Sequence, residues 1–124
     1  MEAWPIGFIV LYLAFVAKQM VCDFFLQTSW MARGKEGRAG WLRPMVAHTG
    51  VHALGTLAIV LPMAPELWYL AVVDFAVHGL IDRAKALLSR GIPMTDPRFW
   101  WLFGADQALH QLTHLVYLLM LLDA

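Results

Sequence analysis

Charged residues are scarce in this chain of 124 residues. Asp, Glu, Lys and Arg together make up only 15% of it, and hydrophobic residues make up 60%. An average soluble domain carries roughly a quarter charged residues and about half apolar residues. A soluble domain of this length buries a small fraction of its chain, so it could not hide so much apolar surface. The composition therefore predicts an integral membrane protein.

Two further absences exclude classes of function. The formal net charge is zero, so the chain lacks the basic excess that a nucleic-acid partner would require. The single cysteine, Cys22, excludes an intramolecular disulfide framework. Nucleophilic catalysis by Cys22 has little support, because no base is evident beside it in the sequence. Only Glu2 is charged before the first apolar segment, so a cleavable signal peptide is not expected.

The apolar residues form four segments, at about residues 4–26, 44–61, 66–88 and 99–122. Each is close to the roughly 20 residues that cross a hydrocarbon core as a helix. Pro44 and Pro97 suit the first turn of a helix, and Thr95 or Asp96 could cap the last segment. The sequence predicts an all-α fold: residues 1–124 form a single membrane domain, an integral membrane four-helix bundle.

The basic residues indicate the orientation of that bundle. The connection at 28–43 holds four basic residues and one acid, and the region at 83–98 holds four basic residues and Asp96. The N-terminus, the turn at 62–66 and the C-terminus contain only acidic charges. Because basic loops stay in the cytoplasm, the chain is predicted to be N-out/C-out with two cytoplasmic loops.

Polar residues recur at a spacing of four in each apolar segment. These polar ladders are Gln19, Asp23 and Gln27; His48 and His52; Asp74, His78 and Asp82; and Asp106, His110 and His114. The spacing places the members of a ladder on one helical face. An ionisable side chain that faces lipid costs at least about 2.5–3.5 kcal/mol, so the ladders should face inward. The alternating directions of the helices bring them to similar depths near the cytoplasmic face.

Converging histidines and carboxylates are typical of a site for a divalent metal ion, here zinc or iron. Four-helix bundles hold metal ions with inward-facing carboxylates and histidines, although those sites use Glu and a different spacing. The predicted metal ligands are Asp23, His48, His52, His78, Asp82, Asp106 and His110. The residues expected to orient these ligands are Gln19, Gln27, Asp74, Gln107 and His114. Asp74, one turn deeper than His78, is expected to bind the other ring nitrogen of that imidazole.

The same residues have plainer interpretations. A single His or Asp within a membrane more often joins helices by a hydrogen bond than binds a metal. His114 could serve only that purpose, and Asp82 could end a solvated helix beside Arg83 and Lys85. The convergence of polar groups from four segments at one depth favours a functional centre over these readings.

Four motifs resemble the ordered signatures of a bacterial family of small polytopic membrane proteins, the DUF3307 family. They read "CDFFLQTSWMARGK", "AHTGVH", "HGLIDRAK" and "DQALHQLTH", and they span Asp23 to His114. Members often have a histidine about one turn before the first Asp, where this chain has Lys18 and Gln19, so one coordination position is in question. The resemblance implies a small polytopic membrane protein of bacteria or their phages, and it implies no activity. The expected location is the bacterial inner (cytoplasmic) membrane, which the chain would cross several times.

These features favour a metal-dependent hydrolase that acts on a lipid-linked or membrane-soluble substrate. Asp74 or Asp82 would act as the general base, and Lys35, Arg43 and Lys85 would hold an anionic substrate group. One alternative is a proton or metal-ion conduit, although the outer halves of three helices contain almost no polar groups. The other is a structural subunit of a larger membrane complex. Expected partners are membrane lipid and, in addition, a homo-oligomer or larger complex, with no nucleic acid.

Overall fold

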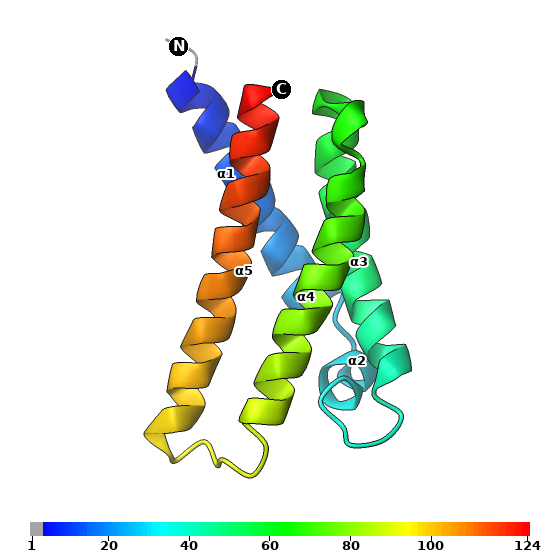
Figure 1. Ribbon diagram of the computed structural model, residues 1–124, viewed down its shortest axis with the longest axis vertical. Coiled ribbons are helices and arrows are strands. Elements are labelled where there is room, and N and C mark those ends of the chain that lie inside the picture. The colour runs from blue at the N-terminus through cyan, green and yellow to red at the C-terminus, as the bar shows by residue number, and fades with distance from the viewer. Residues whose placement is uncertain (1–3) are drawn as a thin grey trace.

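The computed structural model describes residues 4–124, and its main elements are four long helices (Figure 1). They are α1 (Trp4–Met20), α3 (Leu42–Met63), α4 (Tyr69–Leu88) and α5 (Pro97–Asp123). No strand occurs between residues 4 and 124. The prediction of an all-α chain is confirmed. Three of the predicted segments match these helices to within three residues, whereas the first, 4–26, ends six residues beyond α1.

The first helix ends in a widened turn. A π-helical segment, η1 (Val21–Phe25), follows α1 directly, and the backbone N–H of Leu26 donates to the carbonyl of Val21 at 2.8 Å. A bond between residues five apart is the mark of a π-helix, which is rare and often occurs at functional sites. Asp23 lies in this turn, so the backbone departs from the α-helix where the first predicted ligand stands.

A short helix, α2 (Ser29–Gly34), interrupts the connection that the sequence predicts to be a loop. The hydroxyl of Thr28 accepts a hydrogen bond from the backbone N–H of Met31 at 3.2 Å, which is the usual N-cap arrangement. Gly34 then lies against Pro44 of α3, because a Cβ on this glycine would lie 2.5 Å from the Pro44 ring. The capping residue and the glycine contact therefore hold α2 against the beginning of α3.

The remaining connections are short. A 3-10 turn, η2 (Pro65–Leu67), joins α3 to α4, and α3 itself runs past Pro62 to Met63. Asp96 caps α5 as predicted, since its carboxylate accepts from the backbone N–H of Arg98 at 2.9 Å and Pro97 occupies the first turn. The hydrogen bond from the Arg98 side chain lowers the pKa of the Asp96 carboxyl below its usual value.

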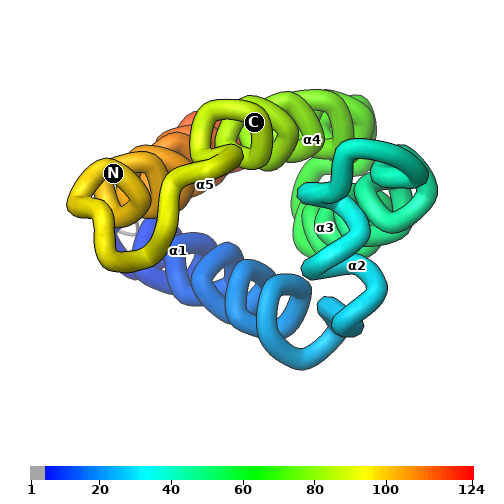
Figure 2. The backbone as a smooth tube through the Cα atoms, turned by 90° about the horizontal axis from the view of Figure 1, so that it is seen from below, coloured from blue at the N-terminus to red at the C-terminus, as the bar shows by residue number. Residues whose placement is uncertain are grey.

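The four long helices surround a common interior (Figure 2). α3 packs against α4, α4 against α5, and α5 against α1, while α1 also contacts α3. Both ends of the described chain and the η2 turn lie at one end of the bundle (Figure 1). α2 and the α4–α5 connection lie at the other end, which is called the loop end below.

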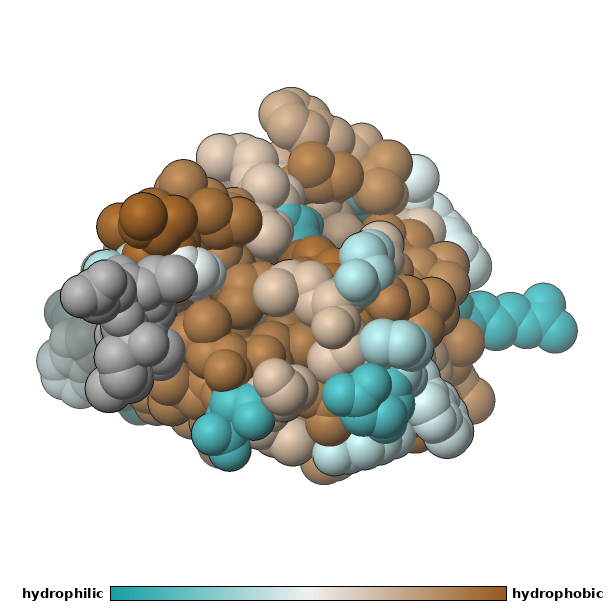
Figure 3. Space-filling model, turned by 90° about the horizontal axis from the view of Figure 1, so that it is seen from above, coloured by the Kyte–Doolittle hydropathy of each residue, from teal (hydrophilic) through white to brown (hydrophobic). Residues whose placement is uncertain are grey.

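The bundle has an inverted polarity. All five histidines are buried, together with Lys18, Asp74, Asp82 and Asp106. Large apolar side chains lie on the outside of every long helix, and the view onto the end that holds the termini is mostly hydrophobic (Figure 3). The apolar core contains Leu11, Phe15, Val60, Ala64, Leu70, Tyr117, Leu118 and Leu121. The interior thus divides into an apolar part toward the termini and a polar part toward the loop end.

Two stretches of the structure are long and apolar enough to cross a membrane. They are Pro5–Phe25, with a mean hydropathy of 1.8, and Leu42–Met63, with a mean hydropathy of 1.4. α4 and α5 are long enough, but their inward-facing polar residues reduce their hydropathy, and α4 also carries Arg83 and Lys85. By length and hydropathy, two of the four helices predicted to span a membrane are therefore candidate spans.

Candidate metal centre

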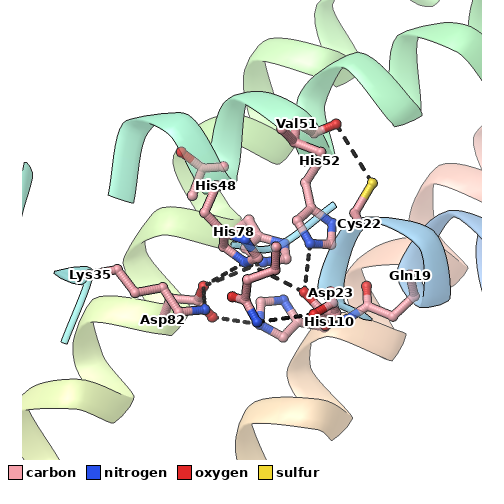
Figure 4. Close-up of polar contacts among 12 residues, drawn as sticks. Gln19, Cys22, Asp23, Lys35, His48, Val51, His52, His78, Asp82 and His110 are labelled. Carbon is pink, nitrogen blue, oxygen red and sulfur yellow. Dashed lines mark hydrogen bonds and ion pairs between the residues drawn. The ribbon is translucent and has the colours of Figure 1, made fainter. Parts of the chain in front are cut away.

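Seven polar side chains meet in the interior toward the loop end, and we call this group the polar centre. Figure 4 labels all of them except Asp106. η1 supplies Asp23, α3 supplies His48 and His52, α4 supplies His78 and Asp82, and α5 supplies Asp106 and His110. All seven predicted ligands belong to it. The i, i+4 spacing explains this convergence, because each helix presents its pair on the face that turns inward.

The carboxylate of Asp23 contacts two imidazoles of α3. Its Oδ1 atom lies 2.7 Å from Nε2 of His52 and 3.4 Å from Nε2 of His48. The other carboxylate oxygen accepts a hydrogen bond from the side-chain amide of Gln19. The amide of Gln27 donates to the backbone carbonyl of Asp23 at 3.0 Å. Both glutamines therefore fix Asp23, which is the orienting contact expected of them.

Asp82 connects four other side chains. Its Oδ1 atom lies 3.1 Å from Nε2 of His110, and its Oδ2 atom lies 3.4 Å from Nε2 of His48 and 3.5 Å from Nε2 of His78. The ammonium group of Lys35 lies 3.1 Å from the same Oδ2 atom. Asp82 thus links α4 to α3, to α5 and to the segment after α2.

His78 is surrounded by the other three imidazoles of the polar centre. Its ring centroid lies 3.9 Å from that of His52, 4.0 Å from that of His110 and 5.3 Å from that of His48. Two sets of donors share it: Asp23, His48, His52 and His78 form one, and His78, Asp82 and His110 form the other. Within each set the potential ligand atoms all lie within 4.8 Å of one another.

Several buried polar atoms of the centre lack a hydrogen-bond partner among residues 4–124. They are both ring nitrogens of His48, Nδ1 of His52, Nδ1 of His78, and Oδ1 of Asp106. Buried polar groups are nearly always paired, and an unpaired one costs about 1–3 kcal/mol. Nε2 of His48 and Oδ1 of Asp106 do have ion-pair contacts at 3.4 Å, so the atoms without either kind of partner are the Nδ1 atoms of His48, His52 and His78. Three such nitrogen atoms within one small volume are expected of side chains arranged for a ligand.

The separations also suit a metal ion. A tetrahedral ion with bonds of about 2.0–2.1 Å holds its ligand atoms roughly 3.4 Å apart. The Nε2 atom of His48 lies 3.4 Å from a carboxylate oxygen of Asp23 and 3.4 Å from one of Asp82. The Nε2 atom of His110 lies 3.4 Å from Oδ1 of Asp106. The donors of each set lie close enough together to share one ion, whereas Asp106 belongs to neither set and lies beside His110.

A second buried cluster, which we call the Lys18 group, lies deeper in the bundle. The ammonium group of Lys18 donates to Oδ2 of Asp74 at 2.8 Å and lies 2.9 Å from Nε2 of His114. Thr56 donates to the same Asp74 oxygen at 2.7 Å, and Tyr117 donates to Oδ1 at 3.4 Å. Asp74 and His114 therefore share Lys18, and within residues 4–124 neither forms a hydrogen bond or ion pair with a member of the polar centre.

This arrangement differs from the predicted role of Asp74. The sequence predicts that Asp74 orients His78, but Nδ1 of His78 has no hydrogen-bond partner in the part of the chain that the structure describes. The reason is Lys18, whose ammonium group is a stronger partner for a buried carboxylate than a neutral imidazole is. Asp74 consequently joins α4 to α1 through its ion pair with Lys18.

The predicted substrate-binding cations lie in three different settings. Lys35 contacts Asp82 within the polar centre, and only 12% of its side chain is exposed. Lys85 pairs with Glu36 at 3.2 Å at the loop end, and Arg43 is exposed in the first turn of α3. Gln107, another predicted orienting residue, donates to Oδ2 of Asp106 at 3.1 Å.

Sequence reasoning missed three residues of the Lys18 group, because Lys18, Thr56 and Tyr117 were not among the predicted site residues. It also assigned no contact to Arg83, which lies outside both clusters, donates to the carbonyl of Gly37 and lies over the Trp41 ring. Lys18 carried a usable signal, since a lysine five residues before Asp23 is costly in an apolar segment unless it is paired. Cys22 is buried, and its thiol faces the carbonyl of Val51 at 3.7 Å.

Comparison with known proteins tests the resemblance seen in the sequence. The family described as "Protein of unknown function (DUF3307)" matches residues 10–123, which confirms it. No curated protein and no solved structure matches the chain.

Proposed function

The chain belongs to the DUF3307 family, whose description assigns no activity, and from the polar centre we propose that it is a membrane protein that binds a divalent metal ion. The proposed location is the bacterial inner membrane, with all four long helices crossing it. The finer proposal is a metal-dependent hydrolase that acts on a lipid-linked or membrane-soluble substrate.

The inverted polarity of the bundle supports the membrane setting. In water, exposed side chains such as Phe24, Leu80 and Trp101, each about 70% exposed, would be unfavourably placed. In a bilayer the same outward-facing side chains contact acyl chains, and the buried Asp and His residues avoid them. The loop end holds Arg33, Lys35, Arg38, Arg43, Lys85, Arg90 and Arg98. The positive-inside rule places that end in the cytoplasm, with the termini outside.

The observation that carries the metal proposal is the set of unpaired, buried nitrogen atoms beside buried carboxylates. With neutral imidazoles, the carboxylates of Asp23, Asp82 and Asp106 outnumber the ammonium group of Lys35 by two charges. Burying an uncompensated charge is costly, so a doubly charged cation would balance the centre. A set of imidazole and carboxylate donors suits zinc or iron.

The reaction that such a centre favours is hydrolysis. A zinc or similar ion held by these residues would supply Lewis acidity that lowers the pKa of a bound water toward 7. Asp82 holds Lys35 and three imidazoles, so it would position the groups around that water. Asp106 would accept its proton, because its Oδ1 atom accepts no hydrogen bond and has only the contact with His110 at 3.4 Å. Lys85 and Arg43, at the loop end, would attract an anionic group of the substrate.

The structure gives less support to a conduit. A relay across the membrane needs polar groups along its whole length. Here the interior toward the termini is the apolar core, which includes Leu11, Val60 and Leu118 at 2% exposure or less. Within one copy of the chain, the polar path ends at the Lys18 group.

Metal analysis of the purified protein tests the proposal. Protein loaded with zinc or iron in detergent and then freed of unbound metal should retain about one ion per chain. His78→Ala should lose it, because His78 belongs to both donor sets. His114→Ala is the matched control, since it removes a buried imidazole that contacts Lys18 instead of the polar centre. A wild-type protein that retains no ion, or equal retention in the two variants, would overturn the proposal.

A further inference from the structure

We propose that a groove between α1 and α5 holds the hydrocarbon chain of a lipid substrate and directs its polar head to the polar centre. The inference rests on the proposed function, because it names the substrate class of that centre. It also assigns an entry route: the substrate would arrive sideways from the bilayer.

The groove has a volume of about 530 Å³ and follows the seam between the two helices. This volume lies in the range of small-molecule sites, which is about 300–1,000 Å³. Its walls extend along α1 and η1 from Tyr12 to Phe24, a helical rise of about 18 Å. Phe15, Met20, Leu112 and Leu118 add apolar surface along that length. A long, narrow, apolar groove of this kind suits an extended alkyl or isoprenoid chain.

Two polar residues connect the groove to the buried clusters. Gln19 lines the groove, and its amide nitrogen donates to Asp23 of the polar centre. The Oε1 atom of Gln19 is buried and has no hydrogen-bond partner within residues 4–124, so it can accept one from a ligand. His114 lines the groove as well, and its Nε2 atom contacts Lys18. A polar head placed beside Gln19 would therefore be separated from Asp23, a proposed metal ligand, by the Gln19 side chain alone.

The charge of the groove fits a hydrocarbon occupant. The described residues that line it include no Asp, Glu, Lys or Arg. Tyr12, Phe24 and Leu112 on its rim are 53%, 72% and 57% exposed, so the rim opens onto the apolar outer surface of the bundle. A charged or strongly hydrated molecule would have to cross this surface without a partner. In the proposed membrane setting, a lipid would reach the groove without leaving the bilayer.

A second apolar groove differs from the first one because no polar side chain lines it. It lies between α3 and α4, has a volume of about 570 Å³, and is lined by residues such as Leu54, Leu57 and Phe75. Its lining contains no polar side chain and no member of the polar centre or of the Lys18 group. Bilayer lipid can lie against both grooves, but only the α1–α5 groove leads to buried polar residues. The α3–α4 groove is therefore an internal control.

Photolabelling tests the inference. The probe is a phosphatidylglycerol with a diazirine on one acyl chain, incorporated into nanodiscs with the full chain, and labelled peptides are identified by mass spectrometry. The readout is the ratio of label on the α1–α5 groove to label on the α3–α4 groove. Ala108→Phe fills the first groove, and Ala53→Phe makes the same change in the second one. Metal content is measured on the same samples.

We expect Ala108→Phe to lower the ratio about fivefold or more, because an added ring occupies the space of the acyl chain. Ala53→Phe should raise the ratio or leave it unchanged. An unchanged ratio in Ala108→Phe would overturn the inference, and so would cross-links showing that a second copy of the chain fills the groove. If the ratio falls but wild-type protein retains no metal, the groove assignment stands and the proposed metal function fails.

Discussion

The ammonium group of Lys18 lies 2.8 Å from a carboxylate oxygen of Asp74, and the two side chains are only 3% and 2% exposed. This pair joins α1 to α4 through the interior of the bundle. Thr56 of α3 and His114 of α5 complete the contact, so the Lys18 group touches all four long helices. It lies apart from the polar centre, and the two clusters can therefore be perturbed separately.

Asp74→Asn should destabilise the protein by about 3–5 kcal/mol, because it leaves the buried ammonium group without its counter-charge. The double variant Lys18→Met/Asp74→Asn should recover most of that loss, since Asn still accepts from Thr56. Thermal unfolding in detergent measures both effects. Metal content should stay at the wild-type value, and a parallel loss of metal would show that the two clusters act as one.

Lys35→Gln should strengthen metal binding. The Lys35 ammonium group lies 3.1 Å from Asp82 and competes with a cation for that carboxylate. Removing one positive charge at this distance should raise the affinity for zinc on the order of tenfold. Lys85→Gln is the control, because its partner Glu36 is 45% exposed and screened by water. Competition with a zinc-sensitive dye gives both affinities, and weaker binding in Lys35→Gln would contradict the expectation.

The proposed orientation predicts unequal labelling of introduced cysteines in intact cells. With Cys22 replaced by Ala, Glu66→Cys in the η2 turn should react with a membrane-impermeant maleimide. Ala39→Cys at the loop end should react only after the cells are opened. Both positions are exposed in the structure, so accessibility within the protein is not the variable. The reverse pattern would place the basic loops outside.

Gly34→Ala should destabilise the protein by about 1–3 kcal/mol, because the new methyl group would lie 2.5 Å from the rigid Pro44 ring. Gly104→Ala in α5 is the matched control, since a Cβ there meets nothing within 4 Å. That second change should stabilise the protein by about 0.5–1 kcal/mol through helix propensity. Thermal unfolding compares them, and equal effects would show that α2 does not pack tightly on α3.

The ladders were predictable because helical spacing alone places residues four apart on one face. His48 and His52, His78 and Asp82, and Asp106 and His110 needed only that rule and the cost of exposing them to lipid. The depth argument then placed the pairs level with one another. The all-α fold followed from the lengths of the apolar segments.

The partners of individual side chains were not predictable in the same way. Whether Asp74 binds His78 or Lys18 depends on how closely α1 approaches α3, and that approach is set by Gly55, where a Cβ would lie 2.8 Å from the Lys18 chain. Lys35 was expected to hold an anionic substrate group, but α2 carries it toward Asp82. The signal for α2 was Thr28 as an N-cap, and the glycines and basic residues that follow it obscured the signal.

The inverted polarity of the bundle changes what holds its helices together. In a bilayer, separating these helices would leave their apolar outer surface in the same surroundings, because lipid already covers that surface. Little apolar area becomes exposed, so the usual hydrophobic gain contributes little to association, and packing and hydrogen bonds must supply the attraction. Resistance to dissociation in a denaturing detergent should therefore follow the number of intact polar pairs, such as Lys18 with Asp74 and His110 with Asp82. The side chains proposed to act on a substrate would then also hold the four helices together.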